Sequence, residues 1–167
     1  MKKHLLAAVT FVLMLTADII TKSIVDASIS EGQRIYVLGT FVQLTKIYNQ
    51  GGVFGIMQGH KTFFLIMSII VFILLLAFYF YEKQKTFIFS LAMGLIFSGA
   101  IGNILDRLMD KPGVVDFIYI GVEKVFMWPA FNVADMCIVT GAFLLGYVFW
   151  KQEKAALLGK SDSEESE

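Results

Sequence analysis

The apolar positions of the chain fall into four stretches of about 20 residues, the length that a helix needs to cross a bilayer. These stretches are 5–24, 62–81, 87–106 and 131–150. The stretch 62–81 has no charged residue at all, so its helix would be apolar on every side. The pattern therefore predicts a membrane all-α protein with four transmembrane helices.

Four spans place both termini on one side of the membrane and the two long loops, 25–61 and 107–130, on the other. Short runs in these loops are rich in Val, Ile, Tyr, Phe and Thr, which favours strands and a small sheet. These runs are Arg34–Leu38, Phe41–Tyr48 and Val114–Ile120. Four glycines lie within 51–59, after the second of these runs, so this stretch is expected to turn often or to let another chain approach closely.

The stretch 5–24 follows two lysines, which raises the alternative of a cleaved signal peptide. No small-x-small cleavage pattern follows the apolar run, and Asp18 comes instead, so we expect a retained helix. Lysine and arginine are denser in the termini and the 82–86 turn than in the long loops, which predicts cytoplasmic termini. The acidic, serine-rich end of the segment 151–167 predicts a disordered cytoplasmic tail.

Composition excludes several other classes of protein. Hydrophobic residues make up 57% of the chain, the mean hydropathy is +0.71, and the 14 basic and 14 acidic residues give no net charge. A disordered chain would be less hydrophobic, and a nucleic-acid binder would carry a basic surplus, so no nucleic-acid partner is expected. One cysteine, Cys137, excludes an internal disulfide.

The few charges inside the predicted spans gather near their outer ends. They are Asp18, Lys22, Asp106 and Asp135. Ionisable groups cost free energy in a bilayer, so their clustering at one depth predicts a shared polar site just inside the outer leaflet.

Helical spacing adds neighbours to this site. Asn132 shares a helix face with Asp135, and Asn103 shares one with Asp106 and Arg107. Structural ion pairing or interhelical hydrogen bonding would explain most of these residues. Asp135 is different, because it has no basic residue three or four positions away and needs a partner from elsewhere.

Several chemistries have little support in the sequence. His4 and His60 would lie at opposite membrane faces, so no metal site is expected. A Ser–Lys dyad of Ser98 and Lys22 has no residue pattern that marks either as activated. A transporter would need ionisable groups across the bilayer, and the inner halves of the predicted helices have none. A purely structural subunit would leave Asp135 unexplained.

Two carboxyl groups can hydrolyse a peptide bond without a cofactor. When they lie close together their pKa values separate, so one acts as a base toward water and the other as an acid toward the carbonyl. Spacing alone leaves four candidates for the partner of Asp135. They are Asp18, Asp106, Asp110 and Asp116.

At these residues the chain resembles the lipoprotein signal peptidases, the type II signal peptidases of bacterial membranes. The resemblance covers about residues 4–150 and consists of five motifs in order. They are Asp18-x-x-Thr21-Lys22, Asn49-x-Gly51-Gly52-Val53-Phe54, Gly99-Ala100-x-Gly102-Asn103-x-x-Asp106-Arg107, Val114-Val115-Asp116-Phe117 and Phe131-Asn132-x-Ala134-Asp135. Any one is weak, but all five in a four-span chain of this length are specific.

The resemblance implies an aspartic endopeptidase with Asp116 and Asp135 as its dyad, four helices and a small extracytoplasmic sheet cradle. It implies a diacylglyceryl-modified prolipoprotein as substrate, cleavage just before the lipidated cysteine, and inhibition by globomycin. Membrane lipid is the expected surrounding, with no cofactor, no metal and a monomeric state in the bacterial inner membrane. The supporting positions implied are Asn49, Gly51, Asn103, Arg107, Asn132, Asp18, Lys22 and Asp106. We expect Arg107 to hold a substrate oxygen and 51–59 to close as a lid.

Overall fold

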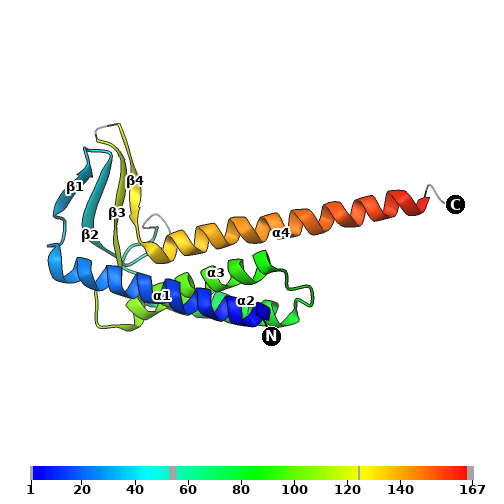
Figure 1. The fold of residues 1–167 in the computed structure, drawn as a ribbon. Helices are drawn as coiled ribbons and strands as arrows, with labels where there is room; N and C mark the ends of the chain where they lie inside the picture. The colour runs from blue at the N-terminus through cyan, green and yellow to red at the C-terminus, as the bar shows by residue number, and fades with distance from the viewer. Residues whose placement is uncertain (1, 53–55, 124, 165–167) are drawn as a thin grey trace.

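The structure, a computed structural model, describes residues 2–52, 56–123 and 125–164. Four long helices form a bundle, and a four-stranded sheet stands at one end of it (Figure 1). The helices are α1 (Lys2–Ser28), α2 (Lys61–Tyr81), α3 (Phe87–Leu108) and α4 (Val133–Glu164). Among the described residues, these four are long and apolar enough to cross a membrane. The predicted architecture of four spans and a small sheet is confirmed.

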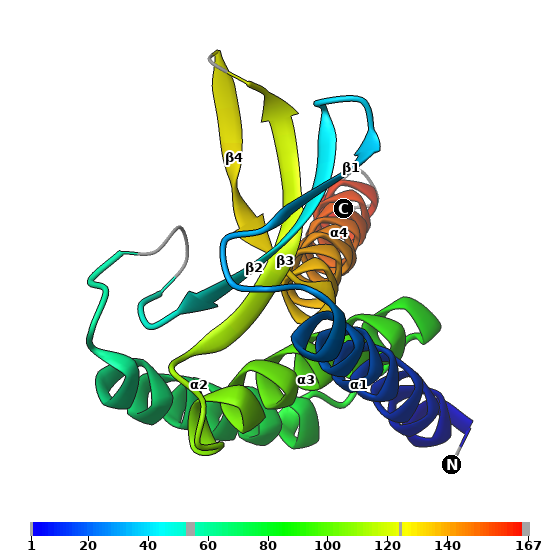
Figure 2. The same ribbon diagram turned by 90° about the vertical axis from the view of Figure 1, so that its left-hand side faces the viewer.

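The sheet is antiparallel throughout, with its strands in chain order. The strands are β1 (Arg34–Leu38), β2 (Val42–Asn49), β3 (Val114–Val122) and β4 (Phe126–Phe131). Gly39 turns β1 into β2 with a φ of +52°, a backbone conformation that glycine adopts without strain. The two hairpins come from the two different long loops and pair through β2 and β3, so the sheet joins segments that are far apart in the chain (Figure 2).

Helix α3 is the centre of the bundle, because 61% of its apolar segment is buried, against 6% of that of α2. Small residues let its neighbours approach closely. A Cβ on Gly94 would lie 2.7 Å from the carbonyl oxygen of Ala7 in α1, and one on Gly99 would overlap the carbonyl of Ala134 in α4. Close backbone approach through small residues is the usual way that membrane helices pack, because lipid is as apolar as their side chains.

The sheet is fastened to the end of the bundle in two ways. Val25 and Ile29, from the end of α1 and just after it, pack with Val115 and Phe117 of β3 in a small apolar core. Asp26 beside them accepts hydrogen bonds from the Tyr48 hydroxyl at 3.0 Å and from Lys111 Nζ at 2.5 Å. Apolar contact and charge together therefore fix β2 and β3 above the helices.

Two segments differ from the sequence predictions. The fourth helix begins at Val133 and not at residue 131, because residues 126–131 form β4 at the edge of the sheet. The same helix continues to Glu164, where the sequence predicted a disordered tail from residue 151. The segment 151–158, KQEKAALL, consists of strong helix formers, which explains why the helix does not stop at the predicted end of the span.

Candidate active site

Asp116 lies in β3, where the sheet meets the bundle, and its side chain is 3% exposed. Its Oδ1 accepts a hydrogen bond from Asn132 Nδ2 at 2.6 Å, and its Oδ2 accepts one from Asn49 Nδ2 at 3.1 Å. Asn49 ends the neighbouring strand β2, and Asn132 directly follows β4 on the other side. Three adjacent strands therefore bring these side chains together.

Asp135 lies in the first turn of α4, and the bonds that begin the helix also hold its carboxylate. Asn132 Oδ1 accepts a hydrogen bond from the Asp135 backbone N–H at 2.9 Å, and Asp135 Oδ2 accepts one from the Asn132 backbone N–H at 3.2 Å. This reciprocal pair is a capping box, which satisfies two backbone donors that have no partner inside the helix. The predicted shared face of Asn132 and Asp135 thus takes the form of a helix cap.

Asn103 of α3 completes the link between the two carboxyl groups. Its Nδ2 donates to Asp135 Oδ1 at 2.8 Å, while its Oδ1 accepts from Lys22 Nζ at 3.1 Å and from Asn132 Nδ2 at 3.2 Å. Because a lysine ammonium can only donate, the Asn103 oxygen must face Lys22, and the amide nitrogen must then face Asp135. Asn132 contacts both carboxyl groups, so the structure brings Asp116 and Asp135 to one site.

Lys22 is buried between two acidic side chains below this pair. Its Nζ lies 2.8 Å from Asp18 Oδ2 and 2.9 Å from Asp106 Oδ2. The two carboxylates also accept hydrogen bonds from the backbone of other elements. Asp18 Oδ1 accepts from the Ala134 N–H at 2.9 Å, and Asp106 Oδ2 accepts from the Val115 N–H at 3.3 Å. Lys22 thus ties α1 to α3, while the acids tie the start of α4 and the start of β3 to the same cluster.

Asn49 and Arg107 hold the start of the glycine-rich stretch beside the site. Asn49 Oδ1 accepts from the Gly51 backbone N–H at 3.0 Å and from Gln58 Nε2 at 3.1 Å. Arg107 Nη2 donates to the Gly51 carbonyl at 3.0 Å, and its Nη1 donates to the Asn103 carbonyl at 3.2 Å. The terminal nitrogens of Arg107 thus bind the protein's own backbone in this structure. Sequence reasoning did not single out Gln58, which carries no pattern beyond its place in the glycine-rich stretch.

The predicted lid falls partly outside the described residues, because 53–55 are not among them. The residues that flank this segment are hydrogen-bonded to each other: the Gly52 backbone N–H donates to the Ile56 carbonyl at 2.9 Å. The described residues on either side of 53–55 therefore lie in contact. A Cβ on Gly51 would overlap the same carbonyl, which explains the need for glycine there. Lid closure stays a prediction.

The environment of Asp116 favours its protonated form. Burial, and after it the nearby carboxylate of Asp135, raises the pKa of Asp116 from 3.8 to about 7, although hydrogen bonds from Asn49 and Asn132 act in the opposite direction. A carboxyl group that keeps its proton near neutrality can donate a hydrogen bond, whereas an ionised one can only accept. The pair thus combines a protonated carboxyl with a second carboxyl that accepts two hydrogen bonds.

The structure separates the four candidate partners of Asp135. Asp116 shares Asn132 with it, Asp18 and Asp106 are engaged with Lys22, and Asp110 is exposed after α3. Among the described side chains, no group of three or more His, Cys, Asp or Glu residues is arranged to hold a metal ion.

Comparison with known proteins gives the site a context. A family model described as signal peptidase (SPase) II matches residues 10–151. The lipoprotein signal peptidase of Staphylococcus carnosus is 35% identical over 150 residues, covering 87% of this chain and 92% of that protein. That of Ectopseudomonas mendocina is 33% identical over 157 residues and covers 92% of each chain.

Two solved structures are similar to this chain across most of its length. Both are described as bacterial membrane enzymes determined by the in meso method, one at 2.3 Å and one at 1.9 Å resolution. The first has a TM-score of 0.80 and 31% sequence identity, and it covers 88% of each chain. The second has a TM-score of 0.75 and the same identity, with 86% of this chain and 91% of the other covered.

Proposed function

Because the chain belongs to the signal peptidase II family, we propose that it removes the signal peptide from diacylglyceryl-modified prolipoproteins by aspartic proteolysis. The observation that carries the mechanism is the placement of Asn132, which hydrogen-bonds both Asp116 and Asp135. Family membership and the four apolar helices make the protein a multi-pass protease of a bacterial membrane.

In the proposed reaction, Asp135 is the base and Asp116 the acid. Both carboxyl oxygens of Asp135 accept hydrogen bonds, one from Asn103 Nδ2 and one from the Asn132 backbone N–H, so the group is held in place to act as the base. It takes a proton from water, the hydroxide oxygen bonds to the scissile carbonyl carbon, and Asp116 gives its proton to the carbonyl oxygen. Asp135 then passes its proton to the leaving nitrogen, the C–N bond breaks, and Asp116 recovers a proton from the new carboxyl group.

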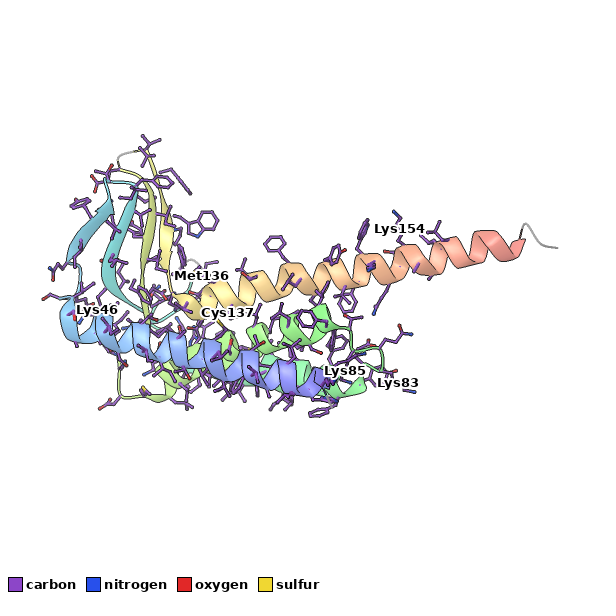
Figure 3. The ribbon with its side chains drawn as sticks, in the orientation of Figure 1. Lys46, Lys83, Lys85, Met136, Cys137 and Lys154 are labelled. Carbon is purple, nitrogen blue, oxygen red and sulfur yellow. The ribbon has the colours of Figure 1, made fainter. Side chains whose placement is uncertain are left out.

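The proposed cleavage lies just before the lipidated cysteine, at the outer end of the bundle. Asp135 begins a membrane-spanning helix, while Asp116 comes from the sheet above it, so the reacting pair lies where the apolar span ends. A signal peptide is an apolar helix whose cleavage point emerges at that depth. We infer cytoplasmic termini, which agree with the lysines at the end of the bundle opposite the sheet, Lys83 and Lys85 among them (Figure 3).

The test is incubation of the purified protein with a diacylglyceryl-modified precursor. Asp116→Asn and Asp135→Asn should each abolish cleavage while the protein keeps its fold, as judged by thermal unfolding. Asp110→Asn is the matched control, because that carboxyl is exposed and lies outside the site. Full activity in either dyad variant would disprove the assignment. Globomycin should block the same reaction in the wild-type protein.

A further inference from the structure

The side chain of Asn49 uses all of its hydrogen-bonding capacity beside the proposed catalytic pair. Its Nδ2 donates to Asp116 Oδ2 at 3.1 Å and to the Gly52 carbonyl at 3.2 Å. Its Oδ1 accepts from the Gly51 backbone N–H at 3.0 Å and from Gln58 Nε2 at 3.1 Å. An asparagine amide has two donor hydrogens and two acceptor lone pairs, so every one of them is engaged. Gln58 supplies one of the two donors that face the oxygen.

Bonds to the backbone determine which way the two side-chain amides point. The Gln50 N–H can only donate, and it donates to Gln58 Oε1 at 3.0 Å, so the Gln58 nitrogen faces Asn49. The Gly51 N–H likewise can only donate, so the Asn49 oxygen faces it and the Asn49 nitrogen faces Asp116. Donation therefore runs from Gln58 through Asn49 to the Asp116 carboxyl group, and each bond in such a chain strengthens the next.

The backbone on both sides of Gln58 has a positive φ, +55° at Met57 and +86° at Gly59. Glycine adopts such a conformation without strain, but a residue with a side chain rarely does. His60 Nδ1 lies 3.3 Å from the Met57 carbonyl oxygen and 3.2 Å from that of Gln58. These oxygens only accept, so Nδ1 carries a proton whether the ring is neutral or charged. Backbone strain persists where surrounding contacts hold it, and the bond from Gln58 to Asn49 is one of those contacts.

We propose that Gln58 is a positioning residue of the reaction: its side chain holds the Asn49 amide in the orientation that donates to Asp116 Oδ2. The inference rests on the proposed function, in which Asp116 is the acid. Asn132 Nδ2 donates to the other oxygen, Oδ1, at 2.6 Å, so the two amides together fix the plane of the carboxyl group. Without Gln58, the Asn49 oxygen would keep only the bond from Gly51, and the amide would be held less firmly.

A loosened Asn49 should also change the protonation of Asp116. The hydrogen bond from Asn49 acts against the raised pKa of Asp116, so weakening that bond should raise this pKa further. The charges of Asp135, Lys22 and Arg107 also act on Asp116, and they are the same in every variant described below. A shift in the pH profile is therefore the decisive measurement, because a loss of stability alone would not produce it.

The first experiment measures cleavage of the diacylglyceryl-modified precursor across pH for Gln58→Met, which keeps the length of the side chain but has no amide donor. The value of kcat should fall about two- to tenfold, and the alkaline limb of the profile should move up by about half a pH unit. Gln58→Lys restores a donor and should keep kcat within about twofold of the wild type. Gln33→Met is the matched control and should change neither quantity. Gln33 is also exposed and also accepts a backbone N–H, from Ser30 at 2.9 Å, but in the loop between α1 and β1.

The second experiment requires no cleavage. The free energy of unfolding of each protein is compared with that of its Asp116→Asn counterpart from about pH 4 to about pH 9, and the pH above which the difference stops changing reports the pKa of Asp116. Gln58→Met should raise this pH in the wild-type background but not in Asn49→Ala, because its effect passes through Asn49.

An unmoved pH in Gln58→Met, or an equal shift in the Asn49→Ala background, would overturn the positioning role. A wild-type protein that cleaves no precursor, while this pH still shifts in Gln58→Met, would overturn the proposed function and with it any role of Gln58 in the reaction. The same result would confirm the contact from Gln58 through Asn49 to Asp116, so the two failures are distinguishable.

Discussion

The raised pKa of Asp116 leads to a measurable dependence of stability on pH. The pKa of Asp116 is about 7 in the folded protein, against 3.8 for a carboxyl in water. The folded state therefore binds a proton that the unfolded state has lost across this interval. The resulting contribution to stability is fully present below about pH 4 and is lost as pH rises through about 7. A shift of about 3 units at 1.36 kcal/mol per unit makes the loss about 4 kcal/mol.

Asp116→Asn isolates this effect, because an amide has the shape of the protonated carboxyl and does not titrate. The free energy of unfolding should be measured for both proteins in the same detergent micelles from about pH 4 to about pH 8. The free energy of unfolding of the variant, minus that of the wild type, should rise by about 4 kcal/mol as pH increases across that range. Titrating groups that both proteins share cancel in this difference. Asp110→Asn, at an exposed carboxyl, should show a constant difference. A constant difference for Asp116→Asn as well would refute the inferred burial of its charge.

Four further outcomes are expected. Hydrolysis should decline as pH rises through about 7, because Asp116 then loses the proton it donates; a rate that still climbs well above that pH would exclude Asp116 as the acid. Lys22→Met should cost about 3–5 kcal/mol of stability, measured by unfolding, because two buried carboxylates lose their cation, and adding Asp18→Asn and Asp106→Asn should restore much of it. Asn132→Ala should lower kcat far more than it raises KM and should cost about 1 kcal/mol from the lost cap; an effect confined to KM would contradict its bridging position. Treatment with a chelator should leave the rate unchanged, and strong inhibition would point to a metal.

The helices were predictable because the length of an apolar stretch is a property of the chain alone. The edge strand β4 was not, because its residues Phe126–Phe131 run directly into the apolar stretch of α4. Pro129 within it also argues against a central strand, yet an edge strand tolerates proline, because the position of its missing N–H can face away from the neighbouring strand. The boundary between sheet and helix was therefore visible only in three dimensions.

The polar site was predictable only in part, for a similar reason. Spacing within one helix placed Asn132 beside Asp135 and Asn103 beside Arg107, and the structure agrees. Contacts between side chains of different helices or strands do not depend on how far apart the residues are in the sequence. Periodicity therefore could not identify Asp116 as the neighbour of Asp135. The bond from Ala134 to Asp18 was likewise invisible, because it joins the first helix to the start of the last.

The division of the site between sheet and bundle also determines when the enzyme is complete during its synthesis. Asp116 belongs to a strand outside the apolar spans, whereas Asp135 and its cap belong to α4, which is synthesised after the other three helices. The first three helices can insert into the bilayer before the second carboxyl exists. Under the proposed mechanism, proteolysis therefore requires α4 to be in place, because Asn132 at its start joins Asp135 to Asp116 of β3, and a chain that has not yet reached α4 lacks the assembled pair of carboxyl groups.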